Sequence, residues 1–156
     1  MDGELAVTQA HGHRKRHAAR RTAIDILYEA DVMERPPSTV LEEWRSAGRS
    51  IPEYAMQLVQ GVAARLPDID RVLGQHAEEW TVHRMAVVDR TILRVACYEL
   101  WSGLPAAIAI NEAVSIAGEL SGDDSGRFIN GVLGRVAREP DGAEGTIESE
   151  GQMPTT

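Results

Sequence analysis

The residues best suited to a chemical role form a basic segment near the start of an acidic chain. Residues 14–21 read RKRHAARR, whereas the whole 156-residue chain has a formal net charge of −8. Positive charge gathered at one place in an acidic protein is most simply a contact surface for phosphates. The basic segment therefore predicts RNA or DNA as the partner, and the alternative is a solvated helix start. Its basic side chains are Arg14, Lys15, Arg16, Arg20 and Arg21.

The other polar side chains do not form a catalytic or metal-binding motif. The sequence contains no phosphate-binding loop, no GxGxxG motif and no HExxH motif. His11, His13 and His17 lie in the basic region without a neighbouring carboxylate or thiol, so we interpret them as solvated. The carboxylates of residues 123–124 precede Ser125 and are of the type that caps a helix. These observations favour a binding module over an enzyme and predict no metal or cofactor.

The elements that must position the basic segment are helices. Apolar residues recur with a period near that of a helix, as Tyr54, Leu58, Val62 and Leu66 do, and we find no convincing strand. Hydrophobic residues make up 43% of the chain and aromatic residues 4%, so the core must be aliphatic. The pattern predicts an all-α fold of about seven helices in two packed three-helix-bundle-like subdomains.

Helix boundaries follow from caps and prolines. Pro36 and Pro37 end the first helix, and Ser38 is a good N-cap for the second. Pro67 breaks or kinks the third helix. The most apolar stretch, residues 80–101, predicts a central helix packed on several sides. We expect helices at about residues 14–34, 38–48, 52–67, 68–76, 80–101, 111–120 and 125–138.

The central helix carries four charged side chains and the one cysteine of the chain. We expect Asp89, Arg90, Arg94 and Glu99 to pair with one another at helical spacing or to form the rim of a protein-binding face. Cys97 is interpreted as a small buried apolar residue, and a single cysteine excludes an internal disulfide. A reducing cytoplasm fits this composition.

The two ends of the chain differ from its helical middle. Residues 1–13 have no usable periodicity and are predicted to be a disordered lead. Residues 139–156 carry five acidic and no basic side chains, which predicts a disordered acidic tail. Between them we expect one helical domain over residues 14–138, with subdomains at about 14–76 and 80–138. No apolar run approaches the roughly 18 residues of a membrane span, so no membrane association is predicted.

Several motifs of the chain together resemble those of one family. At the N-terminal side RKRHAARRTAIDILYE matches an arginine-rich opening before a first helix. The later motifs are VDRTILRVACYEL (Val88–Leu100), Pro105, INEAVSIAGEL (Ile110–Leu120) and RFINGVLGRVA (Arg127–Ala137). In this order they are similar to the motifs of the NusB family, named after N-utilisation substance protein B. The resemblance covers residues 14–138, and the longer lead and the acidic tail depart from the family pattern.

The resemblance implies a function in transcription antitermination. Members of the family bind the boxA element of nascent ribosomal RNA leaders as a heterodimer with NusE, a small-subunit ribosomal protein. With other Nus factors they load onto RNA polymerase and suppress premature, Rho-dependent termination. Some members form a homodimer when NusE is absent, and the sequence leaves the oligomeric state of this chain open.

The resemblance also implies that the loop and first turn of the last helix belong to the RNA surface. Phe128 is suited to stack on a base, worth about 1–3 kcal/mol, although periodicity alone favours packing in the core. Asp124 either accepts a hydrogen bond from a base amino group or caps the helix. Tyr28 is interpreted as a core residue or as an edge contact through its hydroxyl. The predicted RNA-binding residues outside the basic segment are Tyr28, Asp124, Arg127 and Phe128.

Two alternative functions stay open at the level of the sequence. Some ribosomal RNA cytosine methyltransferases carry a NusB-like N-terminal domain, which would make this chain an RNA-recruiting module. The other alternative is a purely protein–protein scaffold, whose basic segment binds an acidic partner or the acidic tail of the chain itself.

Overall fold

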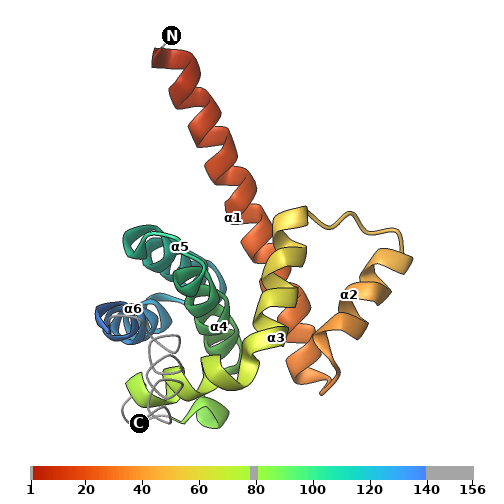
Figure 1. Ribbon diagram of the computed structural model, residues 1–156, viewed down its shortest axis with the longest axis vertical. Coiled ribbons are helices and arrows are strands. Elements are labelled where there is room, and N and C mark those ends of the chain that lie inside the picture. The colour runs from red at the N-terminus through yellow and green to blue at the C-terminus, as the bar shows by residue number, and fades with distance from the viewer. Residues whose placement is uncertain (1, 78–80, 140–156) are drawn as a thin grey trace, which may run out of the picture. The chain divides into compact units, whose positions relative to one another are not determined.

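The computed structural model describes residues 2–77 and 81–139, with side chains described from residue 12 onwards. Over these ranges the chain forms six α-helices and one short 3₁₀ helix, and no strand (Figure 1). The predicted all-α fold is confirmed, and the helix count is close to the predicted seven. The elements are α1 (Asp2–Val32), α2 (Pro37–Ser46), α3 (Glu53–His76), the 3₁₀ helix η1 (Val82–Arg84), α4 (Val87–Trp101), α5 (Ala106–Leu120) and α6 (Asp123–Arg138).

The first helix is longer than the sequence predicted. The backbone of α1 is helical from Asp2, whereas the sequence predicted that the helix begins near residue 14. Good helix formers such as Glu4, Leu5 and Ala6 outweigh the two glycines of this stretch. Of the predicted acidic tail, only its first residue lies within the described residues.

The second helix begins at a proline instead of a side-chain cap. Pro37 occupies the first turn of α2, and the N-cap position is Pro36, with no side-chain cap hydrogen bond. The prediction of Ser38 as N-cap is therefore wrong. Proline suits the first helical position because its backbone angle is already helical and its missing amide hydrogen is not needed there. α2 buries Val40 and Leu41 and contacts α1.

The chain divides into two compact units within α3. The N-terminal unit comprises residues 1–63 and the C-terminal unit comprises residues 64–156. Arg65 leaves helical geometry, with φ −118° and ψ 18°. The cause is Pro67, which has no amide hydrogen and whose ring crowds the carbonyl four residues earlier. The predicted kink at Pro67 is confirmed, whereas the predicted subdomain break between residues 76 and 80 is replaced by this earlier boundary.

In the C-terminal unit α4, α5 and α6 contact one another. Ile92 and Leu93 of α4 are almost completely buried, as expected of a central helix. The first turn of α6 approaches α5 closely at Gly126, where an added Cβ atom would lie 3.4 Å from Cγ1 of Val114. A residue without a side chain at this position lets the start of α6 lie close to α5.

Arg94 of α4 forms an ion pair with α3. Its Nε and Nη2 atoms donate hydrogen bonds of 2.8 and 2.9 Å to the two carboxylate oxygens of Asp70. Both side chains are half-buried, and a two-bond arginine–carboxylate pair fixes orientation as well as distance. The predicted pairing among the charges of the central helix did not include this contact of Arg94 with α3.

Candidate nucleic-acid interface

The basic segment lies on α1 in the N-terminal unit, and its side chains differ in exposure. Arg14, Lys15 and Arg16 are exposed, and Arg21 is half-buried. Arg20 is only 2% exposed. The prediction that all five basic side chains contribute to an exposed electrostatic surface is therefore wrong for Arg20. Three exposed cations stand close together on the helix and can approach a phosphate backbone.

Arg20 is buried beside an aromatic ring that it shares with Arg16. The guanidinium carbon of Arg16 lies 4.8 Å from the centroid of the Tyr54 ring, and that of Arg20 lies 5.6 Å from it. Residues four apart lie on the same helix face, and an arginine within about 6 Å of an aromatic centroid is attracted to the ring. Tyr54, predicted as a member of a core stripe, is half-buried and holds both arginines. The contact with the Tyr54 ring thus orients the side chain of Arg16, which stays exposed to solvent.

At the start of α6, Asp124 and Arg127 form an ion pair with each other. Their side chains are 96% and 73% exposed, so solvent screens the pair and a ligand separates it at little cost. The N-cap residue of α6 is Gly122, with φ +115°, and no side chain caps the helix. The interpretation of the carboxylates at residues 123–124 as helix caps is therefore wrong.

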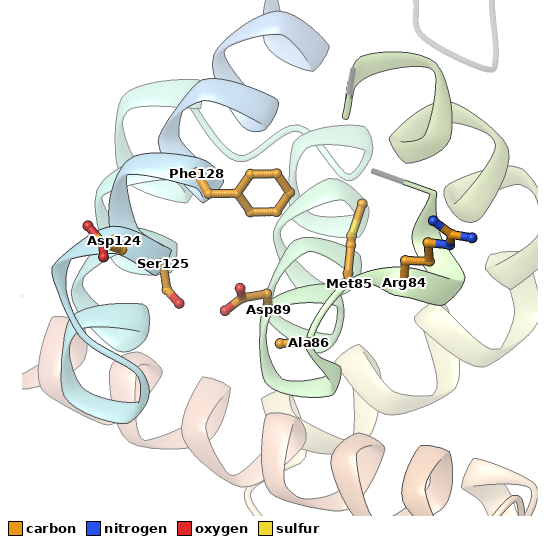
Figure 2. A pocket seen from close by; sticks show the side chains of 7 residues that line it. All are labelled: Arg84, Met85, Ala86, Asp89, Asp124, Ser125 and Phe128. Carbon is orange, nitrogen blue, oxygen red and sulfur yellow. The ribbon is translucent and has the colours of Figure 1, made fainter. Parts of the chain in front are cut away.

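Beside this ion pair lies a pocket of about 320 Å³ formed by η1, α4 and the first turn of α6. Figure 2 shows the ring of Phe128 pointing towards the side chain of Met85, with Asp89 and Ser125 next to them. Phe128 is half-buried and lines the pocket, so it is not fully packed in the core as periodicity alone favoured. The residues of this Asp89 pocket are Arg84, Met85, Ala86, Asp89, Asp124, Ser125 and Phe128.

Asp89 brings a hydrogen-bond acceptor into the pocket. Its carboxyl group is half-buried, and burial raises its pKa, an effect that the hydrogen bond with Ser125 opposes. Its Oδ1 atom is buried and has no hydrogen-bond partner among the described residues. The predicted pairing of Asp89 with other charges of the central helix is wrong, because its partner Ser125 belongs to α6. A buried acceptor without a donor costs about 1–3 kcal/mol, so a donor brought by a ligand would be favoured here.

The remaining predicted residues fall into two groups. Tyr28 lies on α1 with 40% of its surface exposed, so its interpretation as a core residue is wrong. Val32, one turn later on the same helix, is 50% exposed. Tyr28 and the basic segment thus belong to the N-terminal unit. The C-terminal unit contains Asp124, Arg127 and Phe128, which the structure brings together at the Asp89 pocket and the ion pair beside it.

Sequence reasoning missed most of the pocket. Arg84 and Met85 were expected inside a central helix over residues 80–101, but Arg84 ends η1, Met85 follows it, and α4 begins only at Val87. Asp89 and Ser125 are far apart in the chain, and only the packing of α4 with α6 brings them together. The one available signal was a carboxylate in the first turn of the central helix, whose other side chains are mostly apolar.

Residues 2–77 and 81–139 offer neither a metal site nor a membrane span. No three His, Cys, Asp or Glu side chains within these ranges are grouped so that they could hold a metal ion. In the same part of the chain, no helix is both long and apolar enough to cross a membrane. Cys97 is buried, as predicted, and burial raises the pKa of its thiol to about 12, which keeps it protonated and unreactive.

Comparison with known proteins identifies the family of this chain. The family profile described as the NusB family matches residues 17–138. The chain belongs to the NusB family. The transcription antitermination protein NusB of Salinispora tropica is 47% identical over 128 residues, which span 78% of this chain and 94% of that protein. The resemblance recognised in the sequence motifs is therefore confirmed.

Solved NusB structures share this fold. NusB of T. maritima matches with a TM-score of 0.71 at 30% identity, and the match covers 80% of this chain and 91% of that chain. A chain in the crystal structure of the antitermination factors NusB and NusE in complex with dsRNA also matches with a TM-score of 0.71. It is 25% identical, with 80% of this chain and 97% of that chain covered.

Proposed function

We propose that this chain is an RNA-binding transcription antitermination factor. In this proposal it binds the boxA element of nascent ribosomal RNA leaders together with NusE, joins the RNA polymerase antitermination complex and opposes premature, Rho-dependent termination. It acts in the cytoplasm by binding, and not as an enzyme. The observation that carries the proposal is the 47% identity to the antitermination protein NusB of Salinispora tropica, over 94% of the length of that relative.

A solved relative supports the choice of partners. The matching chain in one structure belongs to NusB in a complex with NusE and dsRNA. The similarity covers 97% of that chain, so the whole fold of the relative is represented in this protein. We therefore propose NusE and RNA as the partners of this chain as well.

The exposed basic side chains support the proposal that the chain contacts the phosphates of RNA. Arg14, Lys15 and Arg16 are exposed on α1, in a chain whose net charge is negative. Cations that neutralise phosphates release bound counterions, which favours association at low salt. Arg21, which is half-buried, contributes at the edge of this surface. Because phosphate contacts carry no sequence information, the bases must be read elsewhere.

The second part of the interface lies in the C-terminal unit. Single-stranded RNA is read by stacking and by hydrogen bonds to base edges. Phe128 offers a half-buried ring to stack on, and the Asp124–Arg127 pair offers an exposed acceptor and donor. Tyr28 adds an exposed aromatic side chain on α1 of the N-terminal unit. We propose these residues, with Arg14, Lys15, Arg16 and Arg21 of the basic segment, as the RNA-binding residues, while Arg20 supports the segment from its buried position.

The test is a binding measurement with matched RNAs. The chain is titrated against fluorescent boxA RNA and against a scrambled RNA of the same length and composition, with and without NusE, at two salt concentrations. We expect tighter binding to boxA, and a larger preference for boxA when NusE is present. Equal affinity for the two RNAs in the presence of NusE would refute the proposal.

A further inference from the structure

Tyr54 contacts two arginines of the basic segment that differ in exposure. The guanidinium carbon of Arg16 lies 4.8 Å from the centroid of the Tyr54 ring, and that of Arg20 lies 5.6 Å from it. Arg16 is exposed, whereas Arg20 is 2% exposed. Arg14 and Lys15, the other two exposed cations, have no such contact with an aromatic ring of the described residues. Arg16 therefore differs from them by a ring that holds its guanidinium.

The ring belongs to a rigid part of the N-terminal unit. Tyr54 is the second residue of α3, and the next residue, Ala55, is fully buried. Leu58, one turn further along α3, is 1% exposed. These buried neighbours fix the start of the helix, and a half-buried tyrosine has few rotatable bonds. The contact therefore restricts the long side chain of Arg16 more than it restricts the ring.

We propose that Tyr54 is a positioning residue of the RNA interface, which orients the Arg16 guanidinium for a phosphate of the RNA backbone. The inference rests on the RNA-binding function proposed above and deepens it, because it assigns a role to a residue of α3 that acts through Arg16. An aromatic ring attracts a guanidinium that lies over it. The N–H groups at the edge of the guanidinium can still donate to two oxygens of a phosphate.

Positioning strengthens binding because it lowers the ordering cost. An arginine side chain on the surface loses rotamer freedom when it binds a phosphate. Where a ring already restricts the side chain, part of this loss has occurred in the free protein, and binding is tighter by about two- to tenfold. The number of charges at the interface is the same with and without the ring. Tyr54 therefore changes the affinity for RNA but not the dependence of this affinity on salt.

The experiment measures the affinity for fluorescent boxA RNA at a series of salt concentrations, with NusE present. Tyr54→Leu removes the ring and keeps an apolar side chain, whereas Tyr54→Phe keeps the ring and removes the hydroxyl group. Arg16→Ala is measured alone and together with Tyr54→Leu, which gives a double-mutant cycle. Tyr98→Leu is the matched control, because it removes a half-buried tyrosine ring from α4, in the C-terminal unit.

We expect Tyr54→Leu to weaken binding by about two- to tenfold, and by the same factor at every salt concentration. Arg16→Ala should weaken binding and also reduce the steepness of log affinity against log salt by about 0.7, because it removes a charge. Adding Tyr54→Leu to Arg16→Ala should cause no further loss, since no arginine is left for the ring to orient. Tyr54→Phe and Tyr98→Leu should bind RNA like the original chain.

A second variant keeps the test decisive if Tyr54→Leu does not fold. Arg16→Lys preserves the charge but replaces a planar guanidinium by a compact ammonium on a flexible stem. It should weaken binding and leave the salt dependence unchanged. Arg45→Lys, at an exposed position of α2, is its matched control and should bind RNA like the original chain. Equal affinities of Arg16→Lys and the original chain would overturn the inference.

The outcomes separate this inference from the proposed function. If the original chain prefers boxA over scrambled RNA but Tyr54→Leu binds boxA as tightly as the original chain or more tightly, the inference is overturned and the proposed function stands. The same holds if Tyr54→Leu changes the salt dependence, or if it weakens binding equally when Arg16 is already alanine. If the original chain shows no preference for boxA, both are overturned. Melting temperatures verify that each variant is folded under the conditions of the assay.

Discussion

Replacing Arg14, Lys15 and Arg16 by alanine removes the exposed part of the basic segment. Each single-strand phosphate contact adds about −0.7 to the slope of log affinity against log salt. Three exposed cations therefore account for about −2.1 of the slope, whereas all five basic side chains would account for about −3.5. Because Arg20 is 2% exposed, we expect the basic segment to contribute a salt slope closer to about −2.1 than to about −3.5.

The assay is fluorescence anisotropy of boxA RNA, with NusE present, at a series of salt concentrations. Between about 50 and 200 mM salt, a slope difference of about 2.1 corresponds to a factor of about 20 in affinity. The original complex should lose about 20-fold more affinity over this range than the complex of the triple variant. Because the substituted side chains are exposed, we expect the melting temperature to change little.

A second triple variant controls for net charge. Arg45, Arg71 and Arg138 are exposed arginines outside the basic segment, and their replacement by alanine changes the net charge by the same amount. This control should keep most of the original slope. The reasoning would be refuted if the original chain and the variant of the basic segment had equal slopes of log affinity against log salt. It would also be refuted if the control variant lost as much of this slope as the variant of the basic segment.

Three further predictions concern stability. Arg20→Ala should lower the free energy of unfolding by about 1–3 kcal/mol in a denaturant titration, because a buried side chain over the Tyr54 ring is lost, and it should leave the salt slope of RNA binding unchanged. An unchanged denaturation midpoint would contradict this role. Asp70→Asn should lower the free energy of unfolding by about 1–3 kcal/mol, because it removes the negative charge from the half-buried two-bond pair of Asp70 with Arg94, and a thermal melt that matches the original would be evidence against it. Asp89→Asn should raise the melting temperature at neutral pH. The pKa of Asp89 is raised in the fold, so its charged form opposes folding above that pKa, and the advantage of asparagine should disappear as the pH falls below the unfolded-state value of about 4. Identical melting temperatures at pH 7 would rule this out.

The helical frame follows from patterns that the sequence displays directly. Ile129, Val132, Leu133 and Val136 of α6 recur at helical spacing, and all four are buried. Pro67 restricts the backbone wherever it occurs, so the kink in α3 was predictable from one residue. Such features depend on neighbours within a few residues, and for this reason the fold class and most helix positions could be derived.

The details of the candidate interface depend on contacts between distant residues. Arg20 belongs to the same basic segment as the exposed arginines, yet it is buried, whereas Arg16 contacts the same Tyr54 ring on α3 and stays exposed. Asp89 was predicted to pair along its own helix, but its partner Ser125 lies on α6. Neither fact has a signature in periodicity or composition. Sequence therefore predicted the charge of the site, whereas its pocket and the true exposure of its arginines required the structure.

The most direct test of the central claim is transcription in a purified system. RNA polymerase, Rho, NusE and the other Nus factors transcribe a ribosomal leader, with this chain present or omitted, and full-length transcripts are quantified. We predict that adding the chain increases the fraction of full-length RNA on a template with boxA and has no effect when boxA is scrambled. An unchanged fraction on the boxA template, with every other factor active, would contradict the account.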